Sequence, residues 1–387
     1  MTDVDVLIIG GGPAGLSVAA SLPADVSAVL LHQDAEIGKP VRTSGGTWVR
    51  DMAALGIPEH LYQVINRLDF FSDAKEAVFD QLADQMAVLD ITGSYQYLAS
   101  LVGAACDIRT GTSLHDIRFE AGRYHAVARS RDGAEVRLRA RWVVDASGWK
   151  MAALEKLGLA QKPTRTGVGF EYEFPRGSFQ HDRAVLFVGS AALTGYGWIF
   201  PTPGARLRLG IGVIHPDTDL SPRGVMQAFK GSGAADRFGL SIPDEAETHA
   251  GVIPSVAYAP ELVFGNLMRV GDSANMATPT VGEGIRIAIT EGRALGAALG
   301  QAIHGNRRPL AMWERAATRH YSRNYRFGLM MNHRIAGYTP ERWDKSVARL
   351  ARLGEAEMVA AVRSEFAPRM VARTIALSLL AKFLPPR

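Results

Sequence analysis

The chain has 387 residues, of which 47% are hydrophobic and 21% charged, proportions typical of a globular protein with two or three packed units. Its single cysteine, Cys106, excludes an intrachain disulfide and any multi-cysteine metal or iron–sulfur site, so we expect no metal. One thiol also predicts a reducing, cytoplasmic setting. An acidic start that leads directly into an apolar strand does not predict a signal peptide, and no apolar stretch has the length of a transmembrane helix.

The net charge of +4 is unevenly distributed along the chain. Residues 301–387 contain 16 Lys and Arg against 6 Asp and Glu. This excess has two interpretations: a solvated face of C-terminal helices, or a docking surface for phosphates or an anionic membrane. No nucleic-acid-binding motif accompanies the charge, so we expect no nucleic-acid partner. The predicted location is the cytoplasm, with peripheral membrane contact through the basic C-terminal helices as an open alternative.

The first elements of the chain predict a βαβ unit. Residues 4–9 (VDVLII) form an apolar, β-branched run that is too short for a helix and typical of a buried parallel strand. The sequence GGGPAG follows, then an Ala-rich helical stretch to about Leu22 and a second strand at residues 28–31. This order predicts a parallel, doubly wound sheet.

Three glycines between the first strand and the first helix, Gly10, Gly12 and Gly15, have the GxGxxG spacing. The first permits a tight turn, the second lets the backbone approach a pyrophosphate, and the third allows close contact between helix and strand. Phosphates then lie at the helix N-terminus, where free N–H groups and the helix dipole favour negative charge. In this setting the motif predicts dinucleotide binding.

The same fingerprint expects an acidic residue at the end of the second strand, where it bonds the ribose hydroxyls. Here that position is His32. Three interpretations remain open. His32 itself bonds a ribose oxygen, Asp34 reaches the ribose instead, or His32 is a strand-end histidine without a ligand.

The later elements predict two more structural regions. Short alternating runs at 124–130 and 134–140 flank a glycine turn and predict a β-hairpin. Residues 166–214 contain runs separated by Gly, Pro and polar residues, which predict a mainly antiparallel sheet. A strand at 266–270 leads through a loop to a long helix of small residues, and the chain is helical from about Leu310.

The predicted fold class is therefore α/β: a Rossmann-like dinucleotide-binding domain, an antiparallel β-sheet substrate domain and a helical C-terminus. The expected boundaries are 1–60, 96–162 and 255–305 for the discontinuous dinucleotide-binding domain, 61–95 and 163–254 for the substrate domain, and 306–387 for the helical C-terminal region. Because ligands bind at the carboxyl ends of parallel strands, the other strand ends are the next candidates for a site.

Two more strand ends carry glycine turns and an aspartate. Asp145 ends the run VVDASG, and Gly271 and Asp272 follow the strand at 266–270, with PTVGEGI next along the chain. A carboxylate at the rim, such as that of Asp272, can bond ribitol or ribose hydroxyls. The N–H groups of a helix that begins near Gly284 can hold the anionic O2/N1 edge of a reduced flavin. Three such strand ends in one chain indicate a flavin dinucleotide site.

Together, GGGPAG, DASG and GD…PxxGEGI resemble the FAD-dependent oxidoreductase superfamily that includes p-hydroxybenzoate hydroxylase, flavin halogenases and geranylgeranyl reductases. Two further stretches resemble the geranylgeranyl reductase branch. One is EIGKPVR at 36–42; the other is YGWIFP at 196–201 followed by GIG at 210–212, which is similar to that family's YxWxFP…GxG pattern. The resemblance spans residues 4 to about 299 and, more loosely, the helical C-terminus.

This resemblance implies FAD as the cofactor and an FAD-binding first domain. The implied contacts are Gly10, Gly12, Ala14, Gly15, Arg42, Thr43, Ser44, Gly46, Leu114 (near the adenine), Asp272, Gly284 and Ile285. The candidate cofactor-binding set is completed by His32, Asp145, Gly271, Pro279 and Gly282. Two family features are absent: the cysteine that usually follows the arginine of the PVR stretch is Thr43, and the family arginine expected near Ser94 has no counterpart.

The aromatic residues of YGWIFP are the candidates for a catalytic site. Tyr196, Trp198 and Phe200 alternate along the strand and therefore share one face. They form either the wall of a substrate cavity or an aromatic sheet core. The antiparallel domain is expected to cover the flavin, which favours a cavity wall that suits an apolar, unsaturated substrate.

The leading prediction is a reductase of the geranylgeranyl reductase type. Reduced FAD would deliver hydride to a carbon–carbon double bond of a prenyl chain or an unsaturated natural-product intermediate. The proton would come from Tyr196, or from a water near Thr43 or Ser44. Because the sequence shows no separate NAD(P)H-binding fold, the reductant is either NAD(P)H that docks transiently or a ferredoxin-type protein.

Two other functions stay open at this point. One is an oxygen-using flavin monooxygenase or halogenase, for which Lys75 is the candidate lysine that reaches hypohalous acid. The other is a flavin-dependent cyclase without net redox chemistry. A binding protein without chemistry would not explain three cofactor signatures.

Overall fold

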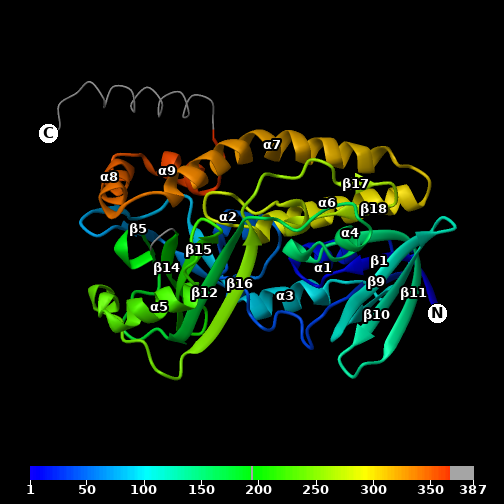
Figure 1. Cartoon of the computed structure of the whole chain (residues 1–387), viewed down its shortest axis with the longest axis horizontal. Helices are drawn as coiled ribbons and strands as arrows, with labels where there is room; N and C mark the ends of the chain where they lie inside the picture. The colour runs from blue at the N-terminus through cyan, green and yellow to red at the C-terminus, as the bar shows by residue number, and fades with distance from the viewer. Residues whose placement is uncertain (193–194, 367–387) are drawn as a thin grey trace.

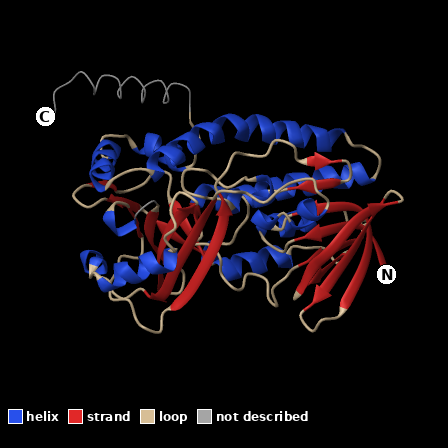
Figure 2. Cartoon of the chain, viewed as in Figure 1, coloured by secondary structure: helices blue, strands red, loops and turns tan. Residues whose placement is uncertain are grey.

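The computed structural model describes residues 1–192 and 195–366. Two large β-sheets lie along the long axis of the molecule, and the helix α7 (Arg308–Ala336) runs above both of them in Figure 1. Helices and strands both occur along the described chain, which ends in the consecutive helices α6 to α9 (Figure 2). This mixed architecture confirms the predicted α/β fold class.

The first sheet has eight strands in the order β17-β18-β11-β1-β2-β8, with β10 and β9 added beyond β11. Their bounds are β1 (Thr2–Ile9), β2 (Ala28–Leu31), β8 (Cys106–Arg109), β9 (Thr112–Glu120), β10 (Arg123–Ser130), β11 (Glu135–Asp145), β17 (Val263–Phe264) and β18 (Leu267–Arg269). β1 pairs in parallel with β2 and β11, and β10 pairs antiparallel with β11 as the predicted hairpin. Leu7 and Ile8 of β1 point to opposite faces and are both fully buried, so β1 lies at the centre of this core.

Two helices that pack beside this sheet begin at the edge formed by the carboxyl ends of its parallel strands. The helix α1 (Pro13–Ala20) packs against α6 (Ile285–Ile303) through small residues. A Cβ at Gly292 would lie 2.5 Å from the carbonyl oxygen of Ala14, and one at Gly296 would lie 2.5 Å from that of Val18. The contacts advance in the same direction along both helices, so α1 and α6 run parallel and their N-termini lie side by side.

The second sheet has seven strands in the order β16-β12-β15-β14-β13-β5-β6. Their bounds are β5 (Arg67–Phe71), β6 (Glu76–Phe79), β12 (Thr166–Pro175), β13 (Arg183–Phe187), β14 (Tyr196–Thr202), β15 (Arg206–His215) and β16 (Glu247–Pro254). All pairs are antiparallel except β5 with β13. Helix α5 (Pro222–Gly231) covers one face, where Met226 and Phe229 enter the core. We propose the two large sheets as the centres of the two domains expected from the sequence.

A small third sheet and short helices join the two large sheets. It consists of β3 (Gly46–Trp48), β7 (Met86–Leu89) and β4 (Tyr62–Ile65) in that order. The helices around it and around the first sheet are α2 (Val49–Ala54), α3 (Ile91–Ser100) and α4 (Ala152–Lys156). Met52 of α2 and Leu98 of α3 are buried in the same core as α1 and α6.

The C-terminal region continues from α7 into α8 (Pro340–Leu350) and α9 (Glu355–Val362). On the inner side of α7, the Tyr321 hydroxyl donates a 2.7 Å hydrogen bond to Glu291 of α6. After α9, Arg363 donates to both carboxylate oxygens of Asp51 on α2, which ties this region to the body of the protein. Residues 367–387 lie outside the described residues. Within the described ranges, none of the helices combines the length and the apolar character needed to cross a bilayer.

Candidate active site

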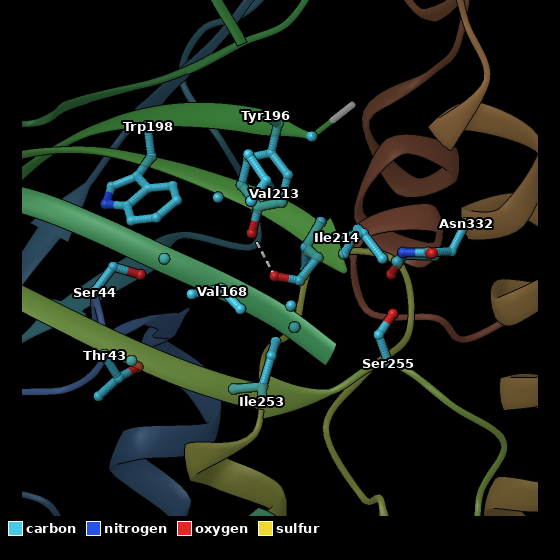
Figure 3. Close-up of a pocket in the computed structure, with 18 of the residues that line it drawn as sticks. Thr43, Ser44, Val168, Tyr196, Trp198, Val213, Ile214, Ile253, Ser255 and Asn332 are labelled. Carbon is cyan, nitrogen blue, oxygen red and sulfur yellow. Dashed lines mark hydrogen bonds between the residues drawn. The ribbon is translucent and has the colours of Figure 1, made fainter. Parts of the chain in front are cut away.

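A groove of about 630 Å³ lies at the carboxyl ends of β1, β2 and β18, where doubly wound sheets bind nucleotides. The first residues of α1 and α6 both open onto it. A second cavity of about 150 Å³ adjoins this groove (Figure 3). Four residues line both: Arg42, Thr43, Ile253 and Gly282.

The three glycines of the fingerprint have different surroundings. Gly10 has a φ of +110°, and a Cβ there would lie 2.2 Å from the carbonyl oxygen of Ala146. A Cβ at Gly15 would lie 1.9 Å from the carbonyl oxygen of Gly10. A Cβ at Gly12 would meet nothing within 4 Å and would project into the groove. Gly10 and Gly15 therefore permit the turn and the packing, and Gly12 leaves the helix N-terminus open to a phosphate.

His32 directly follows β2 and lines the groove, at the position where the fingerprint expects an acid. Its Nε2 lies 3.3 Å from the carbonyl oxygen of Glu36, and its ring packs against Gly11, where a Cβ would be 2.8 Å from Nδ1. Burial lowers the pKa of His32, and the nearby carboxylate of Asp34 opposes this only in part. The imidazole is therefore neutral at pH 7.

Asp34 also lines the groove and forms a bidentate ion pair with Arg42, with N···O distances of 2.6 and 3.0 Å. Burial alone would raise the pKa of Asp34, but the hydrogen bonds from Arg42 hold it below its usual value. Each carboxylate oxygen keeps a lone pair for a further donor. The structure thus brings both His32 and Asp34 to the groove.

Asp145, the last residue of β11, is fully buried and is not among the residues that line the groove. Its carboxylate accepts hydrogen bonds from the backbone N–H and hydroxyl of Ser147 and from the N–H groups of Ala153 and Leu154, at 2.6–3.1 Å. Its neighbours from Ala146 to Lys150 do line the groove. We propose that Asp145 positions this loop and the start of α4 rather than touching a cofactor.

Asp272 lines the groove directly beside the start of α6: its Oδ1 lies 3.5 Å from where a Cβ of Gly284 would stand. Burial raises the pKa of the Asp272 carboxyl to about 6. Within residues 1–192 and 195–366 no side chain or backbone group donates a hydrogen bond to it. A carboxylate in this setting needs a donor, and a ribitol or ribose hydroxyl supplies one.

The start of α6 closes the end of the groove that adjoins the second cavity. Gly284 is the N-cap of α6, and Gly282, Gly284 and Ile285 line the groove. The other predicted cofactor residues lie in three places. Ala14, Arg42, Thr43, Leu114 and Gly271 line the groove, Ser44 and Pro279 line the second cavity, and Gly46 packs against the ring of Phe200.

These features fit FAD. The groove has an open glycine at a helix N-terminus for phosphates, a carboxylate that lacks a donor, and a second helix N-terminus for the anionic edge of the flavin. It extends from Leu114 to Gly282, and the Gly282 end adjoins the second cavity.

The second cavity lies between the seven-stranded sheet and the end of α7, which contributes Asn332, Ile335 and Ala336. Residues that pair across β16, β12, β15 and β14 form three parallel rows. The glycine row consists of Gly251, Gly169, Gly212 and Tyr196. The acid–aromatic row consists of His249, Glu171, Gly210 and Trp198. The ionic row consists of Glu247, Glu173, Arg208 and Phe200. The cavity opens over the glycine row because three of its four residues have no side chain.

Two of the three predicted aromatic residues line this cavity. Tyr196 donates a 2.5 Å hydrogen bond to the carbonyl oxygen of Val281, and Trp198 lies over Gly210, where a Cβ would be 2.2 Å from the indole (Figure 3). Phe200 is buried against Gly46 and is not among the lining residues. Trp198 is only 8% exposed and also belongs to a hydrophobic core cluster, so its side chain both lines the cavity and packs in the core.

Comparison with known proteins identifies the family. A family model described as lycopene cyclase protein matches residues 5–340. The chain belongs to this family. It is similar to the digeranylgeranylglycerophospholipid reductase of Methanocella arvoryzae, with 25% identity over 319 residues, 78% of this chain and 79% of the relative.

Solved structures show the same fold. One is a geranylgeranyl bacteriochlorophyll reductase-like protein from Thermoplasma acidophilum, with a TM-score of 0.82 and 19% identity over 97% of this chain and 100% of that chain. Another is p-nitrophenol 4-monooxygenase from Pseudomonas putida, with a TM-score of 0.75 and 16% identity over 94% and 99%. The resemblance to the geranylgeranyl reductases and their monooxygenase neighbours is therefore confirmed.

For this member of the family, sequence reasoning missed several polar residues of the cavity, among them Glu171 and His249. A signal for the first was present, because Glu171 and Glu173 alternate with aromatic residues in FEYEF and buried carboxylates need partners. His249 had no such signal. It reaches the cavity because β16 pairs with β12 in the register that sets His249 opposite Glu171.

Proposed function

We propose that this protein is an FAD-dependent reductase of carbon–carbon double bonds in a prenyl chain. The observation that carries the proposal is the direct contact between the two cavities through Arg42, Thr43, Ile253 and Gly282. A substrate held in the second cavity therefore reaches the cofactor end of the groove. The curated relatives are named as reductases of a digeranylgeranyl lipid, which supports this function over an oxygen-using enzyme.

The lining of the second cavity suits a hydrocarbon chain. Val213, Ile214, Ile253 and the two aromatic residues supply apolar walls. Ser255 and Asn332 lie at one side of the cavity in Figure 3, away from Trp198. The buried Arg165 donates to both of them, at 2.7 and 2.6 Å, so this polar side is held in place. An amphiphilic substrate would direct its polar end to this side.

When bound, reduced FAD supplies a hydride. The protein must hold the double bond of the substrate near the cofactor, exclude water and provide a proton. Tyr196 is poorly suited as the proton donor, because burial raises its pKa to about 12 and its hydroxyl already donates to Val281. Thr43 and Ser44 line the cavity and are placed to hold a water.

A flavin-dependent cyclase without net redox change is the second candidate, because the matching family model is described as lycopene cyclase protein. Both reactions need an apolar cavity beside a flavin, and in both a proton is added to a double bond of the substrate. They differ in whether the flavin ends oxidised. For a halogenase the structure offers little support: Lys75 is exposed in the turn between β5 and β6, and the lining residues of the cavity, within the described chain, include no lysine.

The outer face of α7 supports a peripheral membrane contact near this cavity. Six exposed arginines follow each other at helical spacing with the exposed Met312 and Met330 between them: Arg308, Arg315, Arg319, Arg323, Arg326 and Arg334. In the part of the chain that the structure describes, none of the six has a carboxylate partner. This arginine face extends for about 40 Å, and the same helix lines the cavity with Asn332. An anionic membrane surface would bring a lipid substrate to this side.

The membrane contact is tested by sedimentation with vesicles. Anionic vesicles should bind the protein at low salt, whereas neutral vesicles should not. Arg319→Gln with Arg323→Gln should weaken binding roughly 30-fold, since each arginine contributes about 1 kcal/mol near an anionic surface. Equal binding to both vesicle types would contradict the contact.

The reductase function is tested by an anaerobic flavin assay. The electrons come from an external donor, either NAD(P)H or a ferredoxin-type protein, so the assay first reduces the bound FAD with dithionite. Adding a lipid with geranylgeranyl chains should then reoxidise the flavin and add two hydrogens per double bond. The same lipid with saturated chains is the control. A cyclised product with the flavin still reduced would establish the cyclase, and an oxygenated product formed only when oxygen is admitted in a second arm would favour a monooxygenase.

A further inference from the structure

The acid–aromatic row places a carboxylate and an imidazole together at the wall of the second cavity. Glu171 on β12 and His249 on β16 both line the cavity, with side chains only 4% and 10% exposed. The distance between His249 Nδ1 and Glu171 Oε1 is 3.3 Å. Trp198 Nε1 donates a 2.8 Å hydrogen bond to the other oxygen, Oε2. The indole therefore holds the carboxyl group through Oε2, and Oε1 faces His249.

A path to solvent continues from the other side of the imidazole. His249 Nε2 lies 4.0 Å from Glu247 Oε2, and the Glu247 side chain is 64% exposed. Arg206 donates a 2.7 Å hydrogen bond to Glu247 Oε1, which keeps Glu247 beside the histidine. The chain of groups thus leads from water, through Glu247 and His249, to Glu171 at the cavity.

The other charged groups around Glu171 and His249 form ion pairs or hydrogen bonds with other partners. Glu173 accepts from Arg206 and Arg208, both at 2.7 Å, and lies 3.8 Å from His249. Arg208 Nε lies 3.8 Å from Glu171 Oε1, and its Nη1 donates to backbone carbonyls of Ser44 and Leu89. Arg42, the remaining charged residue of the cavity lining, is paired with Asp34. Glu171 and His249 are therefore the lining residues best placed to transfer a proton.

We propose that Glu171 is the general acid that protonates the substrate double bond, and that His249 and Glu247 return a proton to it from solvent. This inference rests on the proposed function. The π electron pair of the double bond forms a new C–H bond with the Glu171 proton, and the second C–H bond would come from the hydride that reduced FAD supplies when bound. Glu171 is left as a carboxylate, the flavin is oxidised, and the imidazolium of His249 reprotonates Oε1.

The relay is tested first without turnover. A hydrogen bond between His249 Nδ1 and a carboxylate should give a low-field proton resonance in the FAD-loaded protein. The resonance should be absent in both Glu171→Gln and His249→Gln and present in Tyr196→Phe. A wild-type protein without this resonance would overturn the relay, whatever the substrate is.

The second test follows flavin reoxidation by the geranylgeranyl lipid. Glu171→Gln should keep its FAD content, its melting temperature and its substrate affinity, while the reoxidation rate falls about 10²–10⁴-fold, as for loss of a general acid. Glu171→Asp should recover part of the reoxidation rate. The rate should fall less in His249→Gln than in Glu171→Gln, and less again in Glu247→Gln. A Glu171→Gln protein that reoxidises at the wild-type rate would overturn the proposal, as would a larger loss in Tyr196→Phe. If the wild-type protein reduces no lipid, the proposed function fails, and the resonance still decides whether the pair exists.

Discussion

The two cavities of this protein are built in different ways. The groove takes the wall where we propose that phosphates bind from a short continuous stretch, residues 9–14, and its far end from residues between 271 and 285. The second cavity takes its wall from four strands, and two of its polar residues, Glu171 and His249, are 78 positions apart in sequence. Backbone N–H groups at a helix start bind phosphate almost independently of the rest of the fold, whereas a wall of cross-strand rows exists only in one register.

Glycine has a different task in each cavity. In the groove, Gly12 leaves room for a ligand, since a Cβ there would meet no protein atom. In the second cavity, Gly210 leaves room for a protein side chain, the indole of Trp198. A Cβ at Gly212 would make an ordinary contact with that indole at 3.4 Å and one at Gly169 a tighter contact at 3.3 Å, so these two glycines leave the cavity open. Substitutions at these positions therefore separate binding from stability.

The largest effect is expected for Gly12→Val. The new side chain occupies the groove without a clash, so FAD affinity should fall at least about 100-fold, or about 2.7 kcal/mol, while the melting temperature of the FAD-free protein stays nearly unchanged. Fluorescence titration and thermal unfolding measure the two quantities. Gly103→Val, at an exposed position with equal free space, is the matched control. Normal affinity in Gly12→Val would show that the phosphates lie elsewhere.

The next effect concerns stability rather than binding. Gly210→Ala places a methyl group 2.2 Å from the indole of Trp198 and should lower the free energy of unfolding by about 1–3 kcal/mol through overpacking. Gly212→Ala, two residues along the same strand, meets the ring only at 3.4 Å and should cost less than about 1 kcal/mol, but it narrows the cavity and should favour shorter chains. Equal melting temperatures for the two variants would contradict the position of the indole.

A pH-dependent effect is expected from Asp272. Its pKa is raised from 3.8 to about 6 in the folded protein, so the folded state holds the proton more tightly than the unfolded state. The free energy of unfolding of the FAD-free protein should therefore fall as pH rises from about 4 to about 6, and Asp272→Asn should remove this fall. Above pH 6 the free energy of unfolding of the variant should exceed that of the wild-type protein by about 1–2 kcal/mol. This is less than the full pKa shift implies, because water in the groove screens the carboxylate. Denaturant unfolding at several pH values checks this; a parallel pH dependence in both proteins would contradict it.

The smallest effect is expected for His32→Glu. A carboxylate accepts bonds from both ribose hydroxyls, whereas a neutral imidazole offers one acceptor. The new charge would lie near Asp34, but Arg42 is already there to offset the repulsion. FAD affinity should stay within about tenfold of the wild-type value, or 1.4 kcal/mol, in the same titration. A loss beyond 100-fold would show that His32 makes a contact that a carboxylate cannot replace.

The sequence signals that predict the groove are local. Gly12, the acidic strand end at Asp272 and the start of α6 near Gly284 all appear at the edge of one groove. Prediction was weaker where a side chain can point to either of two surroundings. Asp145 was expected at the cofactor but turns into the loop that it supports, and Gly46 and Phe200 pack against each other.

By itself, the sequence determined the fold class and the family, because strand periodicity, glycine spacing and helix starts act over a few neighbouring residues. Only the tertiary structure decided that Trp198 faces Glu171, that His249 joins them, and that three glycines from three strands open the cavity. These contacts depend on the register between strands far apart in the chain. A shift of one residue in β16 would turn His249 to the opposite face of the sheet.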